Sequence, residues 1–219
     1  TGSNMGRADS MAVFSIYAQE SSGSSELSRM LINFPVSDIA TDRTNNVVPA
    51  SGNVSFYLRA FNATTPFTLP RDFTLTIAAV SGAAENSGEP ITFNWQEGNG
   101  IDMENYSDAS SSFTQTFDDG SEDLEVDITT LVEQWLDWPT GSSSGNQLGG
   151  KPRYGVGVHL TSSQEVFIAT ADASTNAPAN TDGARRSYYT KHFFARSSEF
   201  FYRRPYIEAR WDSAEKDDR

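Results

Sequence analysis

The segment LEVDITTLVEQW (residues 124–135) decides the fold class, because a strand pattern in it runs directly into a helix pattern. Leu124, Val126 and Ile128 alternate with acidic residues at positions 123, 125 and 127. A period of two with one apolar face is typical of a half-buried β-strand. We therefore predict a strand whose apolar face lies on the core.

The end of the same segment predicts a short helix. Thr130 and Glu133 have the spacing of a capping box, and Leu131 and Trp135 lie four residues apart on one helix face. Pro139 then ends the pattern. The strand and the helix should place their apolar side chains in one continuous core block.

Outward from this segment, the strand pattern recurs between polar turns. Segments with strand character are 11–19, 27–36, 53–62, 72–80, 91–95, 113–117, 154–162, 165–170 and 206–211. The segments 154–162 and 165–170 look like the two arms of a hairpin. Residues 37–52, 81–90, 96–112, 140–150 and 171–184 have the composition of loops.

This organisation predicts an all-β fold. We expect an antiparallel β-sandwich, jelly-roll-like, with one short helix and long loops. No clean linker divides the chain, so a single domain should cover residues 1–211. Residues 212–219 then form a tail or a link to missing sequence.

Composition excludes several classes of function. The chain has no cysteine, which rules out disulfides, thiol catalysis and cysteine-ligated zinc. A net charge of −13 opposes nucleic-acid binding. No apolar run approaches the roughly 20 residues that span a bilayer. We expect neither nucleic acid nor membrane as a partner.

The sequence offers little for catalysis. Its two histidines, His159 and His192, lack the surroundings of a catalytic triad or a metal site, and nucleotide-binding motifs are missing. Loop carboxylates such as Glu97 and Asp102 follow Trp95, but any acidic loop supplies such pairs. We predict a protein that is not an enzyme and needs no cofactor.

Two interpretations of the acidic stretch DDGSEDLEVD (118–127) stay open. Hard oxygen ligands suit calcium, but the spacing of an EF-hand loop is not met. The default interpretation is a solvated acidic turn, and we assign no metal ligand.

Charge is distributed unevenly along the chain. Residues 72–150 hold 15 acidic residues and no basic one, whereas residues 185–211 hold seven basic residues against two acidic ones. The simple interpretation is a pair of solvated faces. The sharper one is a pair of complementary contact surfaces.

The segment RRSYYTKHFFARSSEFFYRR (185–204) interleaves arginine with aromatic residues. Protein interfaces and single-stranded nucleic-acid sites both use this mixture, and the acidic remainder of the chain favours a protein interface. The candidate interface residues are Arg185, Arg186, Tyr188, Tyr189, Phe193, Phe194, Arg196, Phe200, Phe201, Arg203 and Arg204.

Short motifs in order along the chain carry a resemblance. They are Asn4 and Gly6, Phe34-Pro35-Val36, Trp95 and Glu97, VDITTLVEQW (126–135), and Arg204, Pro205 and Ile207. Together they resemble the DNRLRE-type domains, also described as a carbohydrate-binding jelly-roll family. The resemblance implies a jelly-roll fold and suggests sugar binding. Long insertions at 37–52 and 171–203 depart from the family pattern.

A closer likeness involves SNMGRADSMAVFSIYAQESS (3–22), LEVDITTLVEQW (124–135) and RSYYTKHFFARSSEFFYRRPYIEARWDS (186–213). These segments resemble structural proteins of marine tailed phages, including cyanophages. The resemblance implies a location in the virion and a role in assembly with other virion proteins.

Two functions from different classes remain. The first is a phage virion structural protein of the neck, tail, fibre or capsid decoration, which is expected to be a homo-oligomer and could also adhere to a host surface. The alternative is a glycan-binding module or glycan-active enzyme that recognises a cell-surface glycan. Tyr106 and Trp138 are its candidate glycan contacts.

Overall fold

The computed structural model describes residues 7–17, 25–65, 69–80, 112–137, 153, 155–170 and 179–212. These residues form strands β1 (Ser10–Tyr17), β2 (Ser25–Ser28), β3 (Met30–Ile32), β4 (Ser55–Ala60), β5 (Phe73–Ala79), β6 (Ser112–Phe117), β7 (Leu124–Asp127), β8 (Val156–Leu160), β9 (Ser187–Phe194) and β10 (Tyr206–Arg210). They also form helices α1 (Val36–Thr44) and α2 (Thr129–Leu136) and a short 3-10 helix, η3 (Phe201–Arg203).

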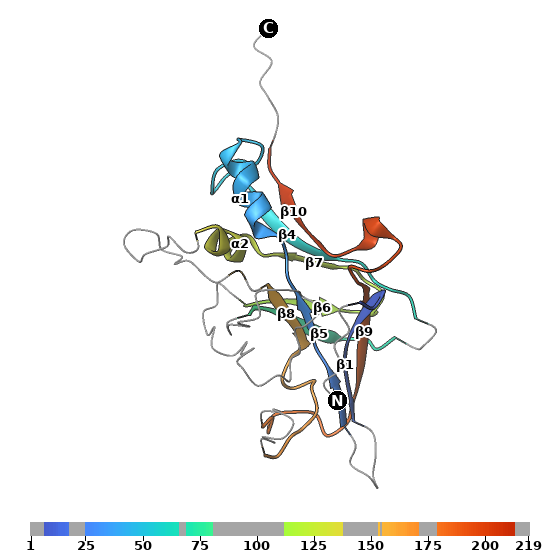
Figure 1. Ribbon diagram of the computed structural model, residues 1–219. Helices are drawn as coiled ribbons and strands as arrows, with labels where there is room; N and C mark the ends of the chain where they lie inside the picture. The colour runs from blue at the N-terminus through green and yellow to red at the C-terminus, as the bar shows by residue number, and fades with distance from the viewer. Residues whose placement is uncertain are drawn as a thin grey trace.

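The strands pair into three antiparallel sheets, with the orders β2-β1-β9, β10-β4-β7 and β3-β8-β5-β6. The prediction of a mostly β, antiparallel protein is confirmed, although two short α-helices are present instead of one. Figure 1 shows α1 near β10 at one end of the molecule and β1 beside β9 toward the other. Neither described α-helix is long and apolar enough to be a membrane span.

The predicted core block is confirmed. Leu124, Ile128, Leu131 and Trp135 are fully buried, and Val126 is buried at the edge of the same cluster. That cluster also takes in residues of β1, β4, β5, β8 and β9. One hydrophobic core therefore joins the three sheets.

The start of α2 differs from the predicted capping box. The residue before the helix is Ile128, and no side chain caps it. The Asp127 carboxylate accepts hydrogen bonds from the N–H and hydroxyl of Thr129, at 2.9 and 2.6 Å. The Thr129 hydroxyl oxygen in turn accepts from the N–H of Phe56 at 2.8 Å, which ties the helix start to β4.

Helix α1 lies in a segment that was predicted to be loop. Val36 is its one buried residue, so the sequence shows no apolar period there. Its main anchor is distant in sequence. The Arg43 guanidinium donates two hydrogen bonds to the Glu133 carboxylate, both at 2.7 Å, and a third to the carbonyl of Pro49 at 3.1 Å. This pair joins α1 to α2.

The predicted hairpin of 154–162 with 165–170 is wrong. Strand β8 pairs with β3 and β5. Val166 and Ile168 form only isolated bridges, to Ala184 and Asn180. Local alternation predicted the strand, but its partners come from distant parts of the chain.

Strand β9 was not recognised in the aromatic and basic stretch. All eight of its residues pair with β1. Its inward positions include Ser187 and Lys191, which are buried but polar, so they interrupt the apolar alternation.

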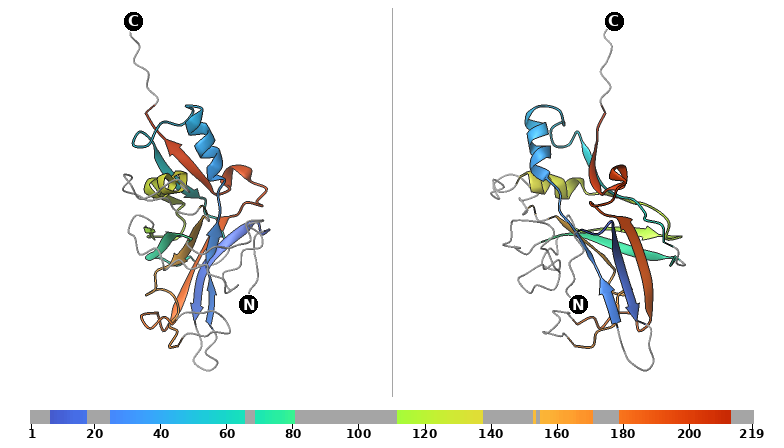
Figure 2. Two further views of the ribbon diagram at one scale, coloured as in Figure 1. Left: turned by 60° about the vertical axis from the view of Figure 1, so that its left-hand side comes forward. Right: turned by 45° about the vertical axis from the view of Figure 1, so that its right-hand side comes forward.

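The junction of two sheets positions the candidate site. Beyond β4, the N–H of Ala63 donates to the carbonyl of His192 at 3.0 Å, and the N–H of Phe194 donates to the carbonyl of Phe61 at 3.0 Å. An isolated bridge joins Asn62 to Phe193. Figure 2 shows η3 on the outside of the molecule beside this junction.

Candidate functional site

Six aromatic residues gather beside the junction of β4, β9 and η3. We call this set the aromatic ledge: Phe61, Phe194, Phe200, Phe201, Tyr202 and Tyr206. Phe201 and Tyr202 keep 74% and 57% of their surfaces exposed, and Phe200 and Tyr206 are also exposed. The rings of Phe194, Phe200, Tyr202 and Phe201 contact one another in turn, and Phe61 contacts Tyr206. Exposed apolar patches of this kind mark interaction surfaces.

The rings of the ledge meet mostly at steep angles. Phe201 and Tyr202 are 5.7 Å apart at 88°, and Phe200 and Tyr202 are 6.3 Å apart at 68°. The Arg203 guanidinium lies 5.3 Å from the centre of the Phe194 ring and 5.8 Å from that of Tyr202. These edge-to-face ring contacts and the guanidinium over two of the rings stabilise the ledge and give it an irregular surface.

A pocket of about 340 Å³ lies against the ledge. Its lining residues are Phe61, Asn62, Ser121, Asp123, Tyr202 and Arg203. The N–H of Asn62 donates to the Asp123 carboxylate at 2.8 Å, which fixes two of these residues relative to each other. The pocket therefore combines two aromatic rings with a carboxylate, an amide, a hydroxyl and a guanidinium.

A buried lysine holds the polar side of the pocket from within the protein. The Lys191 ammonium donates to Asn62 Oδ1 at 2.8 Å, to the carbonyl of Gly120 at 2.8 Å and to that of Glu122 at 2.6 Å. It also lies 4.9 Å from the Phe117 ring centre. Burial lowers the pKa of Lys191 from 10.5 to about 8, and nearby carboxylates, first that of Glu122, oppose the shift.

The lysine and the turn it contacts bear on the calcium interpretation. We call residues 118–123 the acidic turn. Glu122 accepts from the N–H groups of Asp118 and Asp119, at 2.7 and 2.9 Å, and Asp119 accepts from the N–H and hydroxyl of Ser121. These carboxylate oxygens therefore accept hydrogen bonds from within the turn. In the described ranges, no three metal-ligating side chains form a group.

Glycine is required within the acidic turn. Gly120 has a φ of +78°, a conformation that side chains rarely adopt, and a Cβ atom there would collide with the carbonyl of Pro70. The tight approach presents the Gly120 carbonyl to Lys191. In the sequence, the segment DDGSED (118–123) indicated a turn at this glycine.

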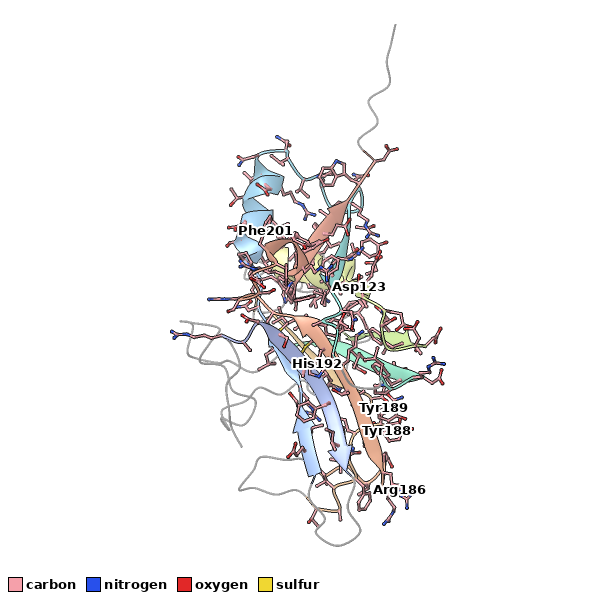
Figure 3. All side chains as sticks on the ribbon, turned by 90° about the vertical axis from the view of Figure 1, so that its right-hand side faces the viewer. Asp123, Arg186, Tyr188, Tyr189, His192 and Phe201 are labelled. Carbon is pink, nitrogen blue, oxygen red and sulfur yellow. The ribbon has the colours of Figure 1, made fainter. Side chains whose placement is uncertain are left out.

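The candidate interface residues of 185–204 fall into different places. Phe193 is fully buried in the core, so this residue is not available to a partner. Tyr189 is partly buried and packs on Phe73. Tyr188 is 67% exposed and stacks on Tyr189. Figure 3 shows Tyr188, Tyr189 and Arg186 well apart from Phe201 along one face of the molecule.

The arginines of the segment differ in their contacts. Arg204 donates twice to the carbonyl of Ser198, at 3.0 and 2.8 Å, and Arg185 lies over the Phe167 ring. Arg196 is exposed. Of the candidate residues, the fold brings Phe194, Phe200, Phe201 and Arg203 together. It adds Phe61, Tyr202 and Tyr206, which the candidate set did not contain.

Several candidates lie outside the described residues. These are the glycan contacts Tyr106 and Trp138 and the loop carboxylates Glu97 and Asp102. The two histidines lie on different strands, His159 on β8 and His192 on β9. Burial, and then the charge of Lys191, lowers the pKa of His192, which keeps the ring neutral at neutral pH.

The described fold and surface define a predominantly antiparallel β protein with an exposed aromatic and arginine ledge. A scan against protein-family models, a search of curated proteins and a search of solved structures each found no match to the chain. The function is therefore inferred from the residues of this chain alone.

Proposed function

We propose that the chain is a phage virion structural protein, built on a jelly-roll-like sandwich, that acts through protein–protein assembly and not through catalysis. Its aromatic ledge docks a second copy of the same chain. The observation that carries this proposal is the exposure of Phe201 and Tyr202, whose rings contact each other within the aromatic ledge.

The chemistry of the ledge favours a protein partner. Aromatic side chains and arginine are enriched at the centres of protein interfaces, and they dominate binding energies there. The four phenylalanines of the ledge, two exposed and two partly buried, offer apolar area but no side-chain hydrogen bonds. Burying such area against a partner removes it from water and stabilises the complex.

The charges beside the ledge favour a second copy. The acidic turn and Arg203 border the same pocket, so one surface carries both signs. A two-fold contact is self-complementary and would place Arg203 of each copy near the acidic turn of the other. Hydrogen bonds from the Ser121 hydroxyl and N–H lower the pKa of Asp119, so its carboxylate stays charged at neutral pH.

The virion setting has different support. The likeness of three segments to structural proteins of marine tailed phages suggests it, and the lack of cysteine and the segregated charge are compatible with it. Association with other virion proteins would then use surfaces outside the ledge, because the copies bury the ledge against each other.

The test is mass photometry and sedimentation of the isolated chain with Phe201→Ala and Tyr188→Ala as a pair. Both side chains are strongly exposed, but Tyr188 lies outside the ledge. We expect the wild type and Tyr188→Ala to form dimers or larger oligomers. Phe201→Ala should weaken association roughly tenfold or more, as the loss of an aromatic interface contact does. A wild-type chain that stays monomeric, or one disrupted only by Tyr188→Ala, would contradict the proposal.

A further inference from the structure

We infer that Lys191 and Asn62 form an intramolecular isopeptide bond, in which the lysine Nζ joins the asparagine Cγ and ammonia leaves. The Lys191 Nζ donates to Asn62 Oδ1 at 2.8 Å. The carbonyl carbon lies one C=O bond, about 1.2 Å, from that oxygen, so the two reacting atoms are no more than about 4 Å apart. The bond lies inside one chain and does not depend on the self-association proposed above.

The fold brings the two side chains together from distant parts of the chain. Lys191 lies on β9, whereas Asn62 follows β4 and forms a bridge with Phe193. The two residues are 129 positions apart in the sequence. Reactive groups that are already held side by side react much faster than free ones, because no entropy is lost in bringing them together. The bond would join β9 to the segment after β4, and through them two of the three sheets.

The surroundings of Lys191 favour the neutral amine, which is the form that attacks a carbonyl carbon. The residue is 1% exposed, and its Nζ lies 4.9 Å from the ring centre of Phe117 and 5.1 Å from that of Phe193. This burial lowers the pKa of Lys191 to about 8, so about half of the amines are neutral at that pH. A lysine that has not reacted keeps titrating at this pKa.

The Glu122 carboxylate supplies a base beside the lysine. One of its oxygens accepts from the N–H groups of Asp118 and Asp119. Its other oxygen is buried and has no hydrogen-bond partner among the residues that the structure describes. An unpaired acceptor in the interior is costly, and a proton taken from Lys191 would satisfy it. Glu122 is also the carboxylate whose charge acts most strongly on Lys191.

The reaction needs no further reactant. The Glu122 carboxylate takes one proton from the Lys191 ammonium, and the neutral Nζ attacks Asn62 Cγ to form a tetrahedral intermediate. Glu122 returns the proton to Nδ2, the bond between Cγ and Nδ2 breaks, and ammonia leaves as the C=O bond forms again. The carboxylate then takes the second proton from Nζ and passes it to the ammonia. One ammonium group and one primary amide thus become one secondary amide and one ammonium ion.

The experiment is tryptic peptide mapping of the purified full chain by mass spectrometry, after incubation at the lysine pKa of about 8. The bond blocks cleavage after Lys191. Residues 60–71 should therefore stay joined to residues 187–196 in one branched peptide, lighter than the sum of the two by one ammonia. A succinimide at another asparagine also loses ammonia, so the branched peptide decides and the intact mass does not. A digest that holds only the linear peptides, cleaved after Lys191, would overturn the inference.

Matched variants test the role of each group. Lys191→Arg keeps the positive charge but loses the amine, and it should form no branched peptide. Glu122→Gln keeps an oxygen for its two N–H donors and should slow bond formation about a hundredfold or more, as the loss of a general acid–base group does. Asp123→Asn makes the same change at the neighbouring exposed carboxylate and should react like the wild type. Equal rates in Glu122→Gln and the wild type would refute the role of Glu122, and a branched peptide in Lys191→Arg would refute the bond.

Discussion

Lys191 is buried, but its hydrogen bonds hold the residues that form the acidic turn and one side of the pocket. Its ammonium is enclosed by one amide oxygen and two carbonyl oxygens and lies over the ring of Phe117. An oxygen cage of this kind would suit a small cation, and here the ammonium fills it. The lysine thereby fixes the acidic turn against β9 and gives the pocket a constant shape.

The pH dependence of this residue can be tested with Lys191→Met. The folded-state pKa of about 8 lies below the ordinary value of 10.5, so between these values the unfolded chain binds more protons than the folded one. The free energy of unfolding contributed by Lys191 should therefore rise with pH across this window and stay flat below it.

The measurement is urea unfolding of wild type and Lys191→Met at about pH 7 and about pH 9.5. The difference, wild type minus variant, should be more positive at the higher pH. Taking this difference cancels the contribution that the titration of all other groups makes to the free energy of unfolding. A difference that is constant or falls over this range would contradict the burial of a charged lysine.

Trp135 is the residue on which the core block depends most. It is fully buried against the apolar face of β7 and the rest of the core cluster. Trp135→Ala should lower the free energy of unfolding by about 3–5 kcal/mol. Trp211→Ala removes the same side chain at a position that is 40% exposed and should cost much less. If both variants lose the same free energy of unfolding in urea, burial does not determine the cost of removing the side chain.

At the scale of elements, an ion pair between Arg43 and Glu133 joins α1 to α2. Glu133→Ala leaves the partly buried Arg43 guanidinium without its carboxylate and should cost about 1.5–3 kcal/mol. Glu125→Ala, in the more exposed network with Arg59 and Arg210, should cost about 0–1 kcal/mol. Hydrogen exchange of the Val36–Thr44 amides should accelerate only in Glu133→Ala. Unchanged exchange there would mean that other contacts hold α1.

The elements that sequence predicted well are those whose pattern is local. Strands β4 and β7 and the first five residues of β5 alternate buried and more exposed residues, and this alternation is visible without the fold. Helix α1 was missed because its anchor is Glu133, which lies 90 residues away. Strand β9 was missed because a polar residue, Lys191, takes an inward position that becomes acceptable only when three distant oxygens surround it.

In the candidate site, too, local sequence features could be predicted and contacts between distant residues could not. Sequence predicted which residue types could form an interface, because arginine and aromatic residues are concentrated in 185–204. It could not separate Phe193 from Phe194, since that choice depends on the pairing of β9 with β1. The pocket was not predicted at all. Its residues come from three separate segments that only the junction of sheets brings together.

For the whole molecule, the proposed two-fold contact makes a prediction about salt. Dimer dissociation should become easier as ionic strength rises, because Arg203 and the acidic turn of the partner are screened. Arg203→Glu and Asp118→Arg should each reduce this salt dependence, and the double variant should restore it. Sedimentation across a salt series is the measurement. If both single variants and the double variant keep the wild-type dependence of dissociation on salt, these charges lie outside the interface.

The central claim is that copies of the chain bury the aromatic ledge against each other. Hydroxyl-radical footprinting below and above the concentration at which oligomers form tests it most directly. Labelling of Phe201 and Tyr202 should fall on association, while labelling of Tyr188, on a separate part of the same face, should stay constant. Oligomers in which Phe201 and Tyr202 remain as reactive as in the dilute chain would contradict the account.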